Sequence, residues 1–155
     1  MIFEIFSFEK SVGGVIFRRQ NGKVLYLLLQ YRSWQWDFPK GHMEKGENEK
    51  DTLSREIQEE TGIVDLDINP KFRMSSTYFY IAKGNEKKER KESGKGIYIF
   101  KKAVYYLVET KTEDVKIDFE NKDFAWLNFN EALERINNSG SKKIISAAHV
   151  LLSEL

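Results

Sequence analysis

The chain has 155 residues, which fits one domain, and we expect residues 1–155 to form it. Its 25 basic and 24 acidic side chains leave a formal net charge of +1, so the whole chain shows no preference for a nucleic acid or a membrane as its partner. The absence of cysteine excludes disulfides, thiol nucleophiles and cysteine-ligated metals, and the presence of only two histidines disfavours a histidine-rich zinc site.

The first part of the chain predicts a β-hairpin followed by a loop. Residues 11–19 and 23–31 are strand-like runs of apolar side chains. Asn21 and Gly22 stand between them, and this pair is a strong hairpin signal. Residues 32–45 show no regular period, so we expect a loop there.

Residues 48–61 have the pattern of a helix. Leu53 and Ile57 are spaced i, i+4 and can form its buried stripe. Gly62 follows as a natural C-terminal stop. We therefore expect one short amphipathic helix in the middle of the chain.

The second part of the chain predicts further strands around a charged segment. Residues 71–82, 97–109 and 124–127 are strand-like. Residues 83–96 are rich in lysine and glutamate and cannot bury apolar surface, so we expect a mobile loop there.

Two helices are expected at the end of the chain, over residues 130–136 and 142–152. Strands first, one helix inserted and helices last indicate a mixed sheet flanked by helices, in the α+β or α/β class. No run approaches the length of a membrane span. The segment 1–10 contains two glutamates and lacks a basic start, so it does not have the pattern of a secretory signal, and a cytoplasmic location is expected.

Three carboxylates gather on the helix predicted in the middle of the chain. Glu56 and Glu60 share a face at i, i+4 with Glu59 beside them, an arrangement that is destabilising without a counter-charge. A solvated acidic face is the common explanation for such a pattern, and a divalent cation is the other, because Mg²⁺ prefers a few carboxylates together with phosphates and water. The carbonyl of Gly41 could serve as a neutral ligand, and Arg55 could hold a carboxylate in a two-pronged contact.

The wider sequence favours the cation. It matches the pattern G-x5-E-x7-R-E-U-x-E-E-x-G-U, in which U is aliphatic, at all nine fixed positions. These positions are Gly41, Glu47, Arg55, Glu56, Ile57, Glu59, Glu60, Gly62 and Ile63. The string resembles the Nudix box, and the likeness is strong over the box and looser elsewhere.

The resemblance implies a Nudix fold, an α/β/α sandwich with a mixed central sheet. It implies an enzyme that uses Mg²⁺ or Mn²⁺ and cleaves a nucleoside diphosphate linked to another group by attack of water on phosphorus. By this likeness the metal ligands are Glu56, Glu59, Glu60 and the Gly41 carbonyl. We place Glu56, Glu59 and Arg55 in the catalytic group, with Glu56 as the first choice of general base.

The residues around the box resemble one group of Nudix enzymes, the asymmetrical diadenosine tetraphosphate hydrolases. Residues 36–42 read W-D-F-P-K-G-H, which fits the W-x-F-P-K-G-H pattern of that group. The likeness implies that Tyr78 stacks on adenine, that Lys101 lies near the polyphosphate and that Glu120 completes the metal site. It also implies a dinucleoside polyphosphate or other nucleotide as substrate, with ATP and AMP as products.

Other residues of this region are candidate substrate contacts with ordinary alternatives. Lys40, His42 and Lys101 could share the neutralisation of a polyphosphate, although Lys40 could also be a solvated loop charge. Trp36 could line the pocket or only hold the loop in place. Tyr78 could stack on a base, at roughly 1–3 kcal/mol, or belong to the core.

Alternative functions remain open at the level of the sequence. One is another Nudix pyrophosphohydrolase acting on nucleoside triphosphates, capped RNA 5′ ends or inositol polyphosphates. The RNA enzymes favour P-Q-G-G where this chain has residues 39–42, P-K-G-H. A non-catalytic Nudix sensor is disfavoured because the box is intact. Residues 136–141 lack the second aromatic that often closes on adenine in the tetraphosphate group.

Overall fold

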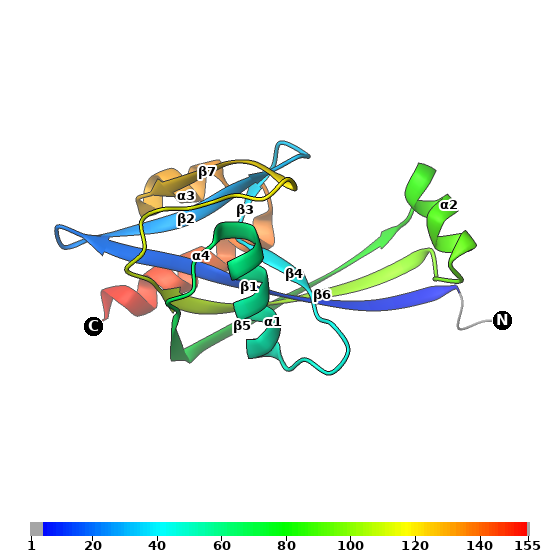
Figure 1. Ribbon diagram of the computed structural model, residues 1–155, viewed down its shortest axis with the longest axis horizontal. Helices are drawn as coiled ribbons and strands as arrows, with labels where there is room; N and C mark the ends of the chain where they lie inside the picture. Colours follow the sequence, from blue (N-terminus) through cyan, green and yellow to red (C-terminus); the bar gives the residue numbers. More distant parts are fainter. Residues whose placement is uncertain (1–4, 155) are drawn as a thin grey trace.

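The computed structural model describes residues 5–154, which form one curved sheet with helices on both faces (Figure 1). The strands and helices, in chain order, are β1 (Phe6–Gln20), β2 (Lys23–Tyr31), β3 (Trp36–Asp37), β4 (Lys40–His42), α1 (Glu49–Thr61), β5 (Asp67–Ile81), α2 (Gly84–Glu92), β6 (Tyr98–Glu109), β7 (Asn121–Leu127), α3 (Phe129–Arg135) and α4 (Ser139–Ser153).

The sheet is mixed, as the sequence predicts. The long strand β1 pairs in parallel with β6 and antiparallel with β2 and β4. The main strand order is β3-β2-β1-β6-β5, with β7 on β2 and β4 on β1. Pro70 lies in edge strand β5 within the register shift between Ile68 and Arg73, where a residue without an N–H is tolerated.

Helices cover the two faces of the sheet and bury two clusters of apolar side chains. On one face, Leu53 and Ile57 of α1 are fully buried against β1, which confirms the predicted stripe. On the other face, α3 and α4 bury residues such as Ala132 and Ile145. Two layers of helix around a sheet form the expected α/β/α arrangement.

None of the helices within residues 5–154 is long and apolar enough to cross a membrane. The expectation that the N-terminal segment is not a secretory signal involves residues 1–4, which lie outside the described residues.

The strands β1, β5 and β6 continue past the helical layers as a three-stranded extension that ends at α2 (Figure 1). We call this extension the arm and define it as residues 6–10, 77–81 and 98–102 together with α2. The sequence did not predict it fully, because β1 was expected to begin at residue 11.

The segment 83–96 was predicted as a loop, and this was wrong, since most of it forms α2. Its composition explains the helix, because Lys, Glu and Arg are good helix formers and Glu86 pairs with Arg90 at i, i+4, 3.1 Å apart. Arg90 also pairs with Glu9 of β1 at 2.6 Å, which fixes α2 to the arm. No residue of α2 is buried, in agreement with the predicted lack of apolar burial.

The segment 32–45 also departs from the prediction of a loop. It contains the short strands β3 and β4. These strands form by pairing with β2 and β1, which are separate segments of the chain, so the sequence of residues 32–45 itself shows no strand pattern.

Candidate active site

The helix α1 carries the predicted carboxylates and has well-defined ends. Asn48 caps its N-terminus by accepting a hydrogen bond from the Asp51 N–H, and Asp51 reciprocates in a capping box. Gly62 ends the helix in the left-handed conformation at φ 76°. These caps set the length of α1 and hence which side chains face the short strand β4.

Strand β4 brings Gly41 against α1. Gly41 pairs with Val12 of β1, and a β-carbon at position 41 would overlap the Glu56 carboxylate. Only glycine leaves room for this approach. The backbone of Gly41 and the carboxylate of Glu56 are therefore neighbours, as a shared metal site would need.

Arg55 holds the loop and the helix together through several contacts. Its guanidinium donates two hydrogen bonds to Glu47, at 2.7 and 2.9 Å, and one to the Glu56 carboxylate at 2.8 Å. It also donates to the His42 carbonyl at 2.9 Å. Arg55 lowers the pKa of Glu47 to about 2, and the fork geometry of a guanidinium is what permits these simultaneous contacts.

Glu60 is the most buried of the carboxylates, with 2% of its surface exposed. Its Oε2 accepts from the Lys40 N–H at 3.2 Å and lies 3.4 Å from the Tyr31 hydroxyl. Burial, followed by the nearby charge of Glu56, raises the pKa of Glu60 to about 8. Burial also raises the pKa of Glu56.

This cluster has more negative charge than its own cations neutralise. Glu120 and Asp118 both add to the negative field at Glu60, whereas Arg55 is already engaged with Glu47. Within residues 5–154, no three acidic or histidine side chains already converge as a finished metal cage. The reason is visible in the contacts, since Glu56 faces Arg55 and Glu60 faces the backbone of Lys40. The donor set, oxygen ligands around uncompensated charge, nevertheless fits a divalent cation such as Mg²⁺.

Basic side chains lie in the same cleft, whose volume is about 610 Å³. Lys40, His42 and Lys101 line it together with the carboxylates of α1. Burial, followed by the charge of Lys101, lowers the pKa of His42, and burial, followed by the charge of Lys40, lowers the pKa of Lys101. A polyphosphate in the cleft would relieve this mutual repulsion.

The structure brings together most of the residues that the sequence singled out. The cleft is lined by Lys40, Gly41, His42, Arg55, Glu56, Glu59, Glu60, Lys101 and Glu120.

Two predicted substrate contacts lie outside the lining of the cleft. Trp36 is half-buried, and the guanidinium of Arg135 stacks over its ring at 4.9 Å. Tyr78 is the cross-strand partner of Lys101 and is 40% exposed, and it lines an adjacent hollow between β5 and the start of α4. The ring of Tyr78 therefore lies beside the cleft and outside the core.

Other residues of the cleft were missed by sequence reasoning. Tyr31, whose hydroxyl donates to the Phe38 carbonyl at 2.7 Å, ends a strand that looked purely structural. Asp118 and Phe119 immediately precede Glu120 and enter the cleft with it. A carboxylate two residues from a predicted ligand was the one signal that could have pointed to Asp118.

Comparison with known proteins matches residues 8–148 to the NUDIX domain. The chain belongs to the NUDIX family. Nudix hydrolases generally use a divalent metal, typically Mg²⁺, and act on small molecules of the nucleotide type. The predicted Nudix fold with its mixed sheet is confirmed, and the chain is a Nudix pyrophosphohydrolase.

The relatives of this Nudix chain include asymmetrical tetraphosphatases. It is 32% identical over 155 residues to the asymmetrical bis(5′-nucleosyl)-tetraphosphatase of Rattus norvegicus, covering 92% of this chain and 95% of that protein. It is 30% identical over 128 residues to the enzyme of the same name from Caenorhabditis elegans, covering 81% of this chain and 83% of that one. A C. elegans Ap4A hydrolase solved as a binary complex is similar with a TM-score of 0.75 and 27% identity, over 95% of this chain and 99% of that chain.

Proposed function

We propose that this chain hydrolyses a dinucleoside tetraphosphate, with diadenosine tetraphosphate giving ATP and AMP. The observation that carries the proposal is a cleft that is lined both by the carboxylates of α1 and by Lys40, His42 and Lys101. This combination suits a substrate with several phosphates. A metal would neutralise part of the phosphate charge, and the basic side chains would neutralise the rest. The named relatives support the choice of substrate.

In this proposal Glu56, Glu59, Glu60, Glu120 and the Gly41 carbonyl would hold Mg²⁺, or Mn²⁺ in its place. A cation bound there would polarise a phosphoryl oxygen and offset the charge that develops on the leaving phosphate. The close approach of Gly41 to Glu56 supports their pairing as ligands.

Proton transfer falls to the carboxylates of α1. Glu56 accepts the proton of the attacking water, and Glu59, whose side chain is the most exposed of the three, faces the open part of the cleft. Arg55 positions Glu56 through its 2.8 Å hydrogen bond.

In the proposal, the substrate is bound by the basic residues of the cleft and by Tyr78 beside it. Lys40, His42 and Lys101 contact the phosphates, and Tyr78 stacks on a base beside Lys101. Trp36 contributes by supporting the strand that leads to Lys40. Its backbone N–H donates to the Asn137 side chain at 2.9 Å.

A substrate panel with Mg²⁺ tests the proposal. It compares diadenosine tetraphosphate with deoxynucleoside triphosphates, a 5′-triphosphorylated RNA and an inositol polyphosphate, with products separated by chromatography. We expect ATP and AMP in equal amounts from the tetraphosphate, at the highest kcat/KM of the panel. Hydrolysis of another member alone would refute the substrate and leave the metal site standing, whereas no hydrolysis of any member would refute both.

A further inference from the structure

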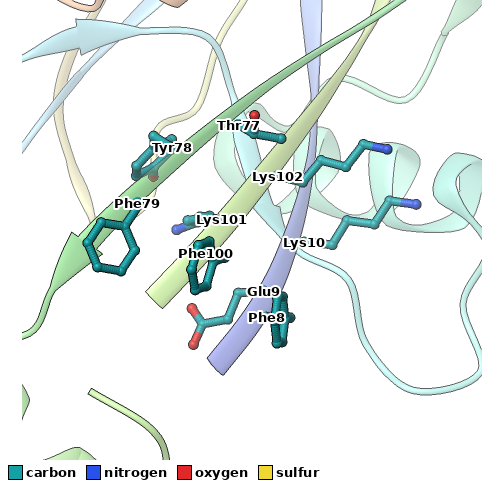
Figure 2. A pocket seen from close by; sticks show the side chains of 9 residues that line it. All are labelled: Phe8, Glu9, Lys10, Thr77, Tyr78, Phe79, Phe100, Lys101 and Lys102. Carbon is teal, nitrogen blue, oxygen red and sulfur yellow. The ribbon is translucent and has the colours of Figure 1, made fainter. Parts of the chain in front are cut away.

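One face of the arm exposes an unusual number of aromatic side chains. Phe8 is 80% exposed, Phe79 49%, Phe6 43% and Phe100 40%. Phe8 and Phe79 are both cross-strand partners of Phe100, so the three rings lie on the same face of three adjacent strands (Figure 2). At roughly 200 Å² for each ring, these side chains expose on the order of 400 Å² of apolar surface, and patches of this size are often functional.

The exposed rings form a shallow platform. Phe8 and Phe100 are nearly parallel, with centroids 5.2 Å apart and planes 14° apart, and Phe79 lies 5.0 Å from Phe100. They border a hollow of about 550 Å³, whose lining also includes Thr77, Tyr78, Lys101 and Lys102. The platform is large enough for flat ligands to stack on it.

A helix packs on this face of the sheet farther along the same strands, but no helix packs over the exposed rings of the described arm. The helix α1 packs over Gly14, where Leu53 and Ile57 approach, and parallel strands such as β1 and β6 are normally covered on both faces. The hollow adjoins the catalytic cleft, since Lys101 borders both, but the rings occupy a different face of the sheet because side chains alternate along a strand. Lys101 and Tyr78 therefore point to the opposite face from Phe100 and Phe79.

Lysines border the platform at both of its ends. Lys10 and Lys102 extend side by side at the end near α1 (Figure 2). Lys10 is paired with Glu49 at 2.6 Å, so Lys102 is the cation that this end offers. Lys91 and Lys95 border a second hollow beside Tyr98 at the other end. Suppose that the arms of two copies packed face to face about a two-fold axis. Because both ends of the platform carry lysines, either orientation of the axis would bring lysines of one copy against lysines of the other. The charge pattern therefore disfavours a second copy and favours a polyanion that carries flat groups.

We propose that the aromatic face of the arm binds single-stranded RNA. Bases stack on Phe8, Phe79 and Phe100, and the phosphates contact Lys102 and the lysines of the far end. From Tyr98 to Lys102 the strand spans about 13 Å, enough for two or three nucleotides. Aromatic rings on a sheet with flanking cations are a recurring means of holding unpaired bases. The net charge of +1 gave no sign of this site because it averages over the whole chain.

Binding is measured by fluorescence anisotropy with labelled octauridylate, in EDTA so that no hydrolysis occurs. We expect saturable binding that Phe8→Ala weakens by about tenfold or more, as expected for the loss of one stacked base. Lys102→Ala should lower the slope of log affinity against log salt by about 0.7, the value for one phosphate contact. Val150→Ala, at a 58% exposed apolar position of α4, is the matched control and should bind as the unmodified protein does.

Several results would overturn the proposal. The first three are no binding of the RNA, equal binding by Phe8→Ala and the unmodified protein, and tighter binding of the matching DNA than of the RNA. The fourth is displacement of the RNA by excess diadenosine tetraphosphate, which would place the RNA in the catalytic cleft. Dimerisation in sedimentation velocity that Phe8→Ala abolishes would assign the face to a second copy. Phe8→Ala should hydrolyse the tetraphosphate normally, so this test is independent of the proposed function.

Discussion

A methyl group on the α-carbon of Gly41 would overlap the carboxylate of Glu56. Gly41→Ala therefore forces either strand β4 or the Glu56 side chain to move. We expect kcat to fall by about 100-fold, since displacement of a catalytic group by about 1 Å has effects of that size. We also expect urea unfolding to show a loss of about 1–3 kcal/mol, as for other overpacked sites.

The comparison that isolates this overlap is the same substitution in a Glu56→Ala background. Without the carboxylate, Gly41→Ala should lower the free energy of unfolding much less. Equal losses in the two backgrounds would show that the strain comes from elsewhere in β4.

Glu60→Gln should lower kcat by several orders of magnitude while the protein stays folded. Glutamine can still accept the hydrogen bond from the Lys40 N–H at 3.2 Å, but it removes the buried negative charge that a divalent cation requires. Burial raises the pKa of Glu60 to about 8, so the charged form is unfavourable without a cation, and the Tm in EDTA should be unchanged or higher. Near-normal turnover of the variant would remove Glu60 from the metal site.

Glu49 should make the protein sensitive to acid. Its side chain accepts hydrogen bonds from Arg73, Lys10 and Tyr106, and the contact with Arg73 is the main reason that the pKa of Glu49 lies well below its usual range. A carboxylate whose pKa is lower in the folded state stabilises the fold above the unfolded pKa of about 4.5, and this contribution is lost as the pH falls further.

Glu49→Gln should therefore reduce stability at pH 7 by about 1–3 kcal/mol and flatten the decline between pH 5 and pH 3. Chemical unfolding across that pH range measures both effects. Glu89→Gln, on the exposed surface of α2, serves as the control and should leave the profile unchanged. A profile of Glu49→Gln as steep as that of the unmodified protein would contradict the assignment.

Tyr78→Ala should raise the KM for the tetraphosphate with little change in kcat. Stacking on a base acts equally on the bound substrate and on the transition state, and the ring is 40% exposed, so its removal leaves no core cavity. Tyr78→Phe keeps the ring and should behave almost as the unmodified enzyme does. If steady-state kinetics gave the same KM for Tyr78→Ala, the base would have to bind elsewhere in the cleft.

The parts of the molecule that the sequence predicted well are those with local causes. The stripe of Leu53 and Ile57, the stop at Gly62 and the spacing of the carboxylates on α1 all follow from the 3.6-residue period and from backbone preferences. The resemblance to the Nudix box rests on the same local pattern, and the predicted metal ligands followed from that resemblance.

What the sequence could not predict depends on pairing between distant segments. Strands β3 and β4 exist because β2 and β1 lie beside them, and Tyr31 approaches Glu60 only after β2 and α1 meet. The helix α2 was missed for another reason. Its composition matches that of disordered segments, and the contact that fixes it, between Arg90 and Glu9, joins residues 81 positions apart.

The parallel pairing of β1 with β6 has a consequence for how the protein folds. Residues 6–17 pair with residues 98–109, about ninety positions further along the chain, so their meeting closes a large loop and should come late in folding. The β1 segment that pairs with β4 at Gly41 lies within this same stretch. Recovery of hydrolysis during refolding should thus report the moment when the two distant halves of the chain join.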